Sequence, residues 1–202
     1  MSDSPTVVKL GGSLAGSPLL HPWLQAIEAT AGSVVIVPGG GPFADAVRAA
    51  QPVMGFDDRA AHVMALLAMA QYGVALASLG TRLIVAGDVA AIEQALSHEQ
   101  VPVWSPWPML RDAPDISESW DVSSDSLALW LATRLQASRV LIVKHRVQPG
   151  ASAQQLVADG IVDAAFPRFL GGFPGIVSLA AAADSPAAAL AADSRLAAIA
   201  MA

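Results

Sequence analysis

Short runs of apolar residues recur along the chain, and each ends at a glycine, a proline or a charged residue. The runs are rich in Val and Ile at consecutive positions, which is typical of strands buried on both faces of a parallel sheet. They predict five strands and two weaker ones, at 160–164 and 175–180. The five are residues 6–10, 33–38, 82–86, 101–104 and 140–144.

Amphipathic or alanine-rich stretches separate these runs and predict helices. The helices are expected at residues 18–31, 43–50, 58–77, 90–97, 124–136, 153–158 and 186–200. Strands that alternate with helices indicate right-handed crossovers and an α/β fold, a three-layer αβα sandwich with a mainly parallel central sheet. In such sheets ligands bind at the carboxyl ends of the strands. The long irregular stretch 105–119 is expected to be a lid or an interface segment.

Composition narrows the class of protein. The chain has 202 residues, of which 54% are hydrophobic and 14% charged, so we expect one domain over residues 1–202 with ample apolar material for its core. No apolar run approaches the roughly 20 residues of a membrane span. The start, "MSDSPTVV", does not resemble a secretory signal. Cysteine is absent, and the net charge is −6 without a basic run. We therefore expect a cytoplasmic protein that binds a small molecule rather than nucleic acid or a membrane.

Three loops at strand ends carry the most distinctive residues. The first is "KLGGS", residues 9–13, and the second is "VPGGGPFAD", which contains Gly39, Gly40 and Gly41. The third is "LIVKHRVQPG", where a strand ends at Lys144, the only lysine besides Lys9. Glycine lets backbone N–H groups approach an anion, and lysine supplies a point charge for phosphate oxygens.

Each glycine loop on its own favours a simpler interpretation, a structural turn. Two such loops, with both lysines of the chain at the same edge of the sheet, favour a phosphate site instead. The P-loop motif and the dinucleotide fingerprint G-x-G-x-x-G are both missing, so the expected phosphate site is of another kind.

The segment "SWDVSSDSLALWLATRL" predicts a helix that begins near Ser123. Acidic residues at a helix start compensate the helix dipole, and this accounts fairly well for Asp125. If the helix begins at the same sheet edge, Asp125 could instead bridge and orient the lysines, while Asp121 and the serines hold substrate.

The helix at 58–77 is rich in Ala and Met and contains His62. A packing role in the core or between subunits is the first interpretation, and contact between His62 and a substrate is the second. His, Asp and Glu nowhere show the spacing typical of metal ligands. The expected metal is therefore Mg²⁺ carried by nucleotide phosphates.

Together these motifs resemble the amino acid kinase superfamily over nearly the whole chain. The stretches "VPGGGPFADAVR", "AAHVMALLAMAQYG" and "SWDVSSDSLALWLA" are similar to those of its short aspartokinase-like kinases. That grouping includes the (aminomethyl)furan-methyl phosphate kinase of methanofuran-type cofactor biosynthesis. The resemblance implies a homo-oligomeric, ATP-dependent kinase with Mg²⁺ on the nucleotide. It would transfer the γ-phosphoryl group to a phosphate or carboxylate acceptor.

The resemblance also implies roles for individual residues. Lys9 would bind the phosphoryl group in flight, and Asp125 would orient Lys9 and keep it charged. The donor side would comprise Gly11, Gly12, Ser13, Lys144 and Arg146. The acceptor side would comprise Gly39, Gly40, Gly41, His62, Asp121 and Ser123.

One loop departs from the family pattern. An acidic "D-x-D-G" loop usually follows the strand that ends in Lys or Thr, and here "KHRVQPG" follows instead. Lys144 and Arg146 are expected to supply the missing nucleotide contacts. The alternative is a catalytically degenerate kinase-fold protein that binds a small anion or acts as an assembly partner.

Overall fold

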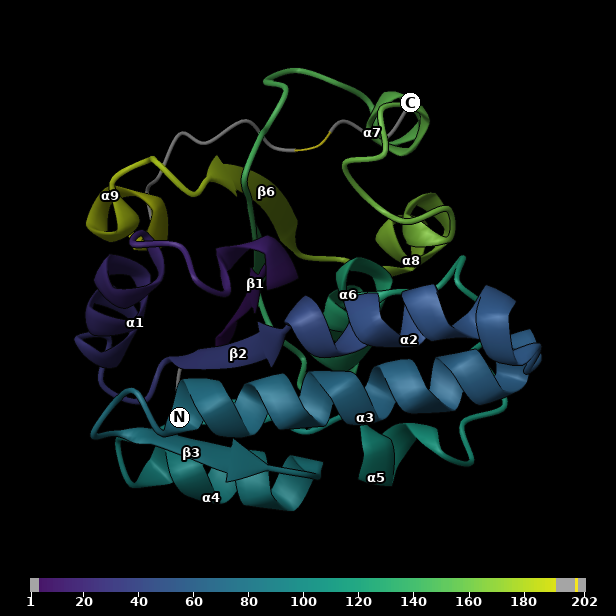
Figure 1. Ribbon diagram of the computed structural model, residues 1–202. Coiled ribbons are helices and arrows are strands. Elements are labelled where there is room, and N and C mark those ends of the chain that lie inside the picture. Colours follow the sequence, from purple (N-terminus) through teal and green to yellow (C-terminus); the bar gives the residue numbers. More distant parts are fainter. Residues whose placement is uncertain (1–3, 192–198, 200–202) are drawn as a thin grey trace.

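Six parallel strands form the centre of the molecule in the order β3-β4-β2-β1-β5-β6. The computed structural model shown in Figure 1 describes residues 4–191 and residue 199. The strands are β1 (Thr6–Leu10), β2 (Val34–Pro38), β3 (Leu83–Ala86), β4 (Val101–Trp104), β5 (Arg139–Lys144) and β6 (Ile176–Ala181). Their parallel pairing confirms the predicted α/β class.

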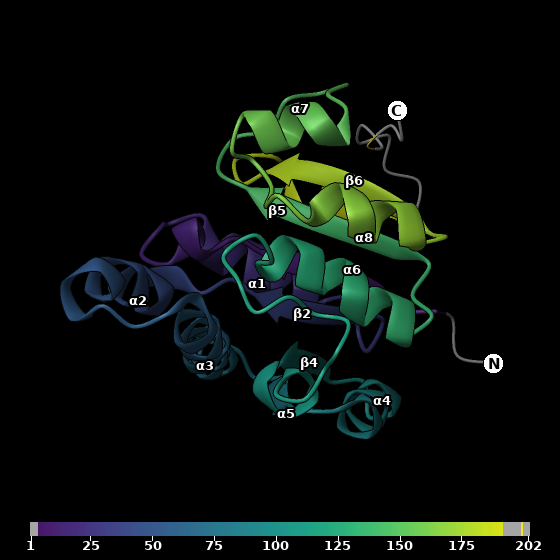
Figure 2. The same cartoon turned by 90° about the vertical axis from the view of Figure 1, so that its right-hand side faces the viewer.

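Helices fill the connections between strands. They are η1 (Gly12–Leu14), α1 (Leu20–Glu28), α2 (Gly41–Met54), α3 (Asp58–Ala77), α4 (Val89–Ser97), α5 (Trp107–Leu110), α6 (Ser124–Arg134), α7 (Ala153–Ala158), α8 (Phe166–Gly172) and α9 (Pro186–Leu190). Helix α6 packs against β1 and β5 on one face of the sheet, where Figure 2 shows it beside α8, and α3 packs against β2 and β4 on the other face. The expected three-layer arrangement is therefore confirmed.

Strand β1 shows how the core divides between the two faces. Side chains alternate along a strand, so Val8 and Leu10 lie on one face and Val7 on the other. Val8 and Leu10 belong to the apolar cluster that includes α1 and the second half of α3. Val7 belongs to the cluster that includes α6 and α8. The alternation places Lys9, two residues after Val7, on the α6 face.

The position of β1 also defines where a ligand can bind. The chain passes from β1 to β2 on one side, and much later returns to β5 on the other side of β1. Leu10, the last residue of β1, lies opposite Pro38 of β2 and Val143 of β5. The loops after these three strands therefore meet at one edge, as the sequence predicted. The strand order changes direction at this edge.

One predicted strand is wrong, and one helix was missed. Residues 160–164 form a loop between α7 and α8, because Gly160 ends α7 in a left-handed conformation with φ 64°. Helix α8 follows, with Phe166 and Leu170 one turn apart and buried. Its two terminal glycines obscure the helical pattern in the sequence. The other weak candidate, 175–180, is confirmed as β6.

Other differences concern the ends of elements. Helix α2 is longer than predicted and includes Pro52 near its end. The irregular segment 105–119 contains the single turn α5, and Leu110 and Ile116 bury their side chains in the core. Part of the predicted helix 186–200 is α9, and most of the remainder lies outside the described residues.

Helix α3 is long and apolar enough, by length and composition alone, to cross a membrane. It packs against α2 and against β2, β3 and β4, and eight of its residues are buried. These contacts make α3 a packed helix of the domain.

Candidate functional site

The two glycine loops touch backbone to backbone at the carboxyl ends of β1 and β2. A Cβ atom added to Gly39 would overlap the backbone nitrogen of Gly12, and a Cβ added to Gly12 would overlap that of Gly41. Gly41, with φ 53°, begins α2 and rests on the ring of Tyr72. The absence of side chains therefore lets the two loops form one continuous wall.

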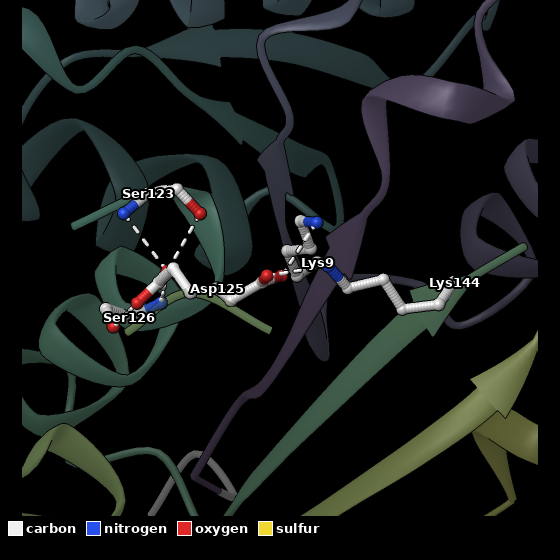
Figure 3. A network of polar contacts seen from close by, with 6 residues as sticks. Lys9, Ser123, Asp125, Ser126 and Lys144 are labelled. Carbon is white, nitrogen blue, oxygen red and sulfur yellow. Dashed lines mark hydrogen bonds and ion pairs between the residues drawn. The ribbon is translucent and has the colours of Figure 1, made fainter. Parts of the chain in front are cut away.

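Both lysines reach the same carboxylate. Lys9 Nζ lies 2.7 Å from Asp125 Oδ1, and Lys144 Nζ lies 2.6 Å from Asp125 Oδ2. Figure 3 shows the two lysine side chains approaching Asp125 from neighbouring strands. The Lys9 and Asp125 side chains are only 4% and 3% exposed, whereas Lys144 is 17% exposed. The structure thus brings together the three charged residues that the sequence singled out.

Burial sets the protonation of this cluster. Desolvation, together with the charge of Lys144, lowers the pKa of Lys9 from 10.5 to about 8, although Asp125 opposes the shift. Burial alone would raise the pKa of Asp125, but the two lysines outweigh it and hold that pKa below its ordinary value. At neutral pH the cluster therefore carries a net positive charge toward the neighbouring cavity.

That cavity has a volume of about 320 Å³. The residues proposed from sequence that line it are Lys9, Gly11, Gly12, Ser13, Gly40, Gly41, His62, Ser123 and Lys144. Asp125 lies behind the lysines and is buried. Gly39 packs against Gly12 instead of lining the cavity. Asp121 and Arg146 are exposed and are not among the lining residues. None of residues 105–119 lines the cavity, all of them within the described part of the chain.

Sequence reasoning did not foresee the far wall of the cavity. It is apolar, formed by Ala44, Ala65, Leu66, Met69, Val122 and Leu127. At its rim Trp120 donates a hydrogen bond to Gln51 on α2, with 2.7 Å between the nitrogen and the oxygen. Arg48 stacks over the Trp120 ring at 4.5 Å and pairs with Asp45. The cavity is thus cationic at the glycine loops and apolar with an aromatic rim elsewhere.

His62 lies between these two regions. It is buried on α3, and burial lowers the pKa of its imidazole, which hydrogen-bonds to the backbone of Ser119. The side chain is therefore neutral at physiological pH. It offers a hydrogen bond to a bound molecule without adding a third positive charge.

Asp163 is the residue near the site that sequence reasoning missed most clearly. It lies in the loop that was predicted as a strand and accepts hydrogen bonds from Ser123 and Ser126 at the start of α6. The Ser123 hydroxyl therefore donates to Asp163 and not into the cavity. No spacing in the sequence indicates this contact, because about 40 residues separate the partners.

Part of the sequence matches a known protein family and one of its members. Residues 4–87 match the amino acid kinase family. The chain is 30% identical over 139 residues to (5-(aminomethyl)furan-3-yl)methyl phosphate kinase of Methanocaldococcus jannaschii. That alignment covers 67% of this chain and 63% of the relative's length.

In the part of the chain that the structure describes, His, Asp and Glu residues form no group of three that could hold a metal ion.

Solved structures with the same fold include uridylate kinases. The enzyme from Archaeoglobus fulgidus has a TM-score of 0.70 and 17% identity, and the match covers 96% of this chain and 98% of that one. UMP kinase from Ureaplasma parvum has a TM-score of 0.63 and 16% identity, with 92% and 93% covered. At these identities the likeness concerns the fold alone.

Proposed function

Because residues 4–87 match the amino acid kinase family, we propose that the chain is an ATP-dependent kinase for a small, phosphate-bearing acceptor. The Lys9–Asp125–Lys144 cluster is the observation that carries this proposal. It presents two cations, held by one buried carboxylate, to a cavity walled by two glycine loops. Phosphoryl transfer depends mainly on positioning and on neutralising charge, and both are available here.

The residues of the chain divide the task between them. Lys9 and Lys144 would contact the oxygens of the transferred group, and Asp125 would keep both ammonium groups aimed at the cavity. Gly11 and Gly12 would wrap phosphates with their backbone, which has no side chains in the way, and Ser13 would add its hydroxyl. Bound ATP, with its Mg²⁺, would supply the γ-phosphoryl group. An anionic acceptor needs no general base.

The acceptor side supports a small substrate with a compact apolar body. A cavity of about 320 Å³ has room for a single ring and its substituents. Trp120 offers a flat face, and Arg48 at the rim offers a charge for an anionic group. The relative from M. jannaschii is named for a furan phosphate substrate. We therefore propose an acceptor of that class, in methanofuran-type cofactor biosynthesis, with a carboxylate acceptor as the second possibility.

Calorimetric titration with Mg-ATP is the first test, because binding does not require the acceptor. We expect micromolar to low-millimolar binding that weakens when Lys144 is replaced by Ala. Arg111→Ala, which removes an exposed arginine whose partner among the described residues is its neighbour Asp112, is the matched control and should bind as the wild type does. The absence of ATP, ADP and GTP binding would contradict the proposal. A kinase-fold protein that binds a small anion would then be the better description.

Phosphoryl transfer is measured next, with (aminomethyl)furan-methyl phosphate as acceptor and ADP release as the signal. Lys9→Ala should abolish turnover while the circular dichroism spectrum stays unchanged. Turnover that survives in this variant would show that Lys9 does not contact the transferred group.

A further inference from the structure

Asp163 connects the start of α6 to a distant loop. Its Oδ2 accepts hydrogen bonds from the Ser123 nitrogen at 3.0 Å, the Ser123 hydroxyl at 2.8 Å and the Ser126 nitrogen at 3.0 Å. Its Oδ1 accepts a hydrogen bond from the Ser126 hydroxyl. An ionised carboxylate has about four acceptor positions, so these four donors match its capacity.

In the sequence, the two serines that donate to Asp163 lie on either side of Asp125. Ser123 is the residue before the helix, Ser126 is its third residue, and Asp125 lies between them. A further hydrogen bond, from the Ala165 nitrogen to the Asp121 carbonyl at 2.9 Å, joins the same two segments. Figure 3 shows Ser123 and Ser126 beside Asp125, with the lysines beyond it. The first turn of α6 is therefore held from outside the helix on both sides of Asp125.

A helix cap alone does not explain this arrangement. Serine is itself a preferred residue before a helix, yet the Ser123 side chain makes no bond to the backbone of α6. The chain instead places a second, half-buried carboxylate close to Asp125. Burial, and then the charge of Asp125, raise the pKa of Asp163. Placing the Asp163 carboxylate near that of Asp125 is electrostatically unfavourable. The arrangement therefore indicates that Asp163 does more than cap the helix.

Asp125 has to be positioned accurately. Asp125 contacts lysines from two different strands at 2.6 and 2.7 Å, so a small displacement of the helix start would break one contact or both. We propose that Asp163 is a positioning residue, which fixes the start of α6 so that Asp125 holds Lys9 and Lys144 together. The effect of Asp163 on catalysis rests on the proposed function. Its effect on the positions of the two lysines rests on geometry alone.

Side-chain NMR of the lysines tests the geometric part without ATP or acceptor. The chain contains two lysines, so lysine labelled with ¹³C and ¹⁵N gives signals from Lys9 and Lys144 only. Asp163→Asn places an amide donor against the serine donors, and we expect both lysine signals to shift. The matched control is Asp159→Asn, which alters an exposed acid four residues earlier, and it should leave both signals in place. Unchanged signals in a folded Asp163→Asn protein would overturn the inference.

Kinetics then separate positioning from stability. Measured well below the unfolding temperature, Asp163→Asn should lower kcat by about tenfold or more and leave the KM for ATP within about threefold, because misplaced groups slow the chemical step. Asp163→Glu keeps the charge and should recover part of kcat. A folded Asp163→Asn enzyme with wild-type kcat would contradict the inference.

If Asp163→Asn does not fold, Ser126→Ala decides, because it removes one of the four hydrogen bonds and keeps the others. It should produce smaller lysine shifts in the same direction, and unchanged signals would overturn the proposal. A wild-type protein without kinase activity would refute the proposed function, yet the lysine signals would still decide the role of Asp163.

Discussion

Lys9 should titrate near pH 8, and this makes alkaline pH a direct test of its role. Burial lowers its pKa from 10.5 to about 8, whereas an exposed lysine stays protonated beyond pH 10. If Lys9 must be charged to bind the transferred group, kcat/KM falls as pH rises through that value. Loss of one proton lowers the rate tenfold per pH unit, so the value at pH 9.5 should be about 30-fold below the plateau.

The loss of activity can be distinguished from unfolding. Between about pH 8 and 10.5 the unfolded chain binds a proton at this position that the folded chain does not. The contribution of Lys9 to the free energy of unfolding therefore rises with pH over this range. Activity and this part of the stability change in opposite directions.

The assay is the initial rate of ADP release from pH 6.5 to 10 at subsaturating ATP and acceptor, with constant ionic strength. The Lys9 side-chain NMR signal gives the titration independently. Because Asp125 supports the protonated lysine, Asp125→Asn should move the midpoint below pH 8. A kcat/KM that stays constant to pH 10, or a midpoint unaffected by Asp125→Asn, would refute the reasoning.

The remaining predictions concern the walls of the cavity. Gly39→Ala should lower the unfolding temperature and weaken ATP binding, since its Cβ would overlap the Gly12 nitrogen. Gly171→Ala, where a Cβ meets nothing within 4 Å, is the control and should not be destabilising, as differential scanning calorimetry can show. Trp120→Ala should raise the acceptor KM by roughly tenfold, about 1.4 kcal/mol, and leave Mg-ATP binding unchanged in calorimetry. Equal losses for ATP and acceptor would argue against Trp120 as part of the acceptor wall.

Hydrophobic patterning was enough to predict the fold because the strands are apolar on both faces. Runs such as Val34–Pro38 leave little choice except a buried parallel strand. Patterning failed at 160–164, where Gly160 is left-handed and Asp163 faces a helix start that lies far away in the sequence. It also failed at α8, whose glycines resemble a loop until Phe166 and Leu170 are seen to pack.

The charged centre of the site was accessible from sequence for a different reason. Lys9 and Lys144 end strands, and topology alone brings strand ends to one edge of a parallel sheet. The apolar wall that α2 and α3 form was not accessible, because each of these helices contributes only part of its length to the cavity. Which part does so depends on how the helices pack, and the periodicity of the sequence does not reveal this. Arg146 shows the converse, since a charge near a strand end can still point to solvent.

The central place of β1 has a consequence for how the protein is made. Strand β1 is the first to leave the ribosome, yet its partner β5 begins more than a hundred residues later. Until β5 and α6 arrive, one edge of β1 is open and Lys9 has no carboxylate beside it. Contacts of such long sequence separation slow folding and expose strand edges to other chains. The pairing of β5 with β1 therefore extends the sheet past β1 and brings Lys144 to the charged centre in the same late step.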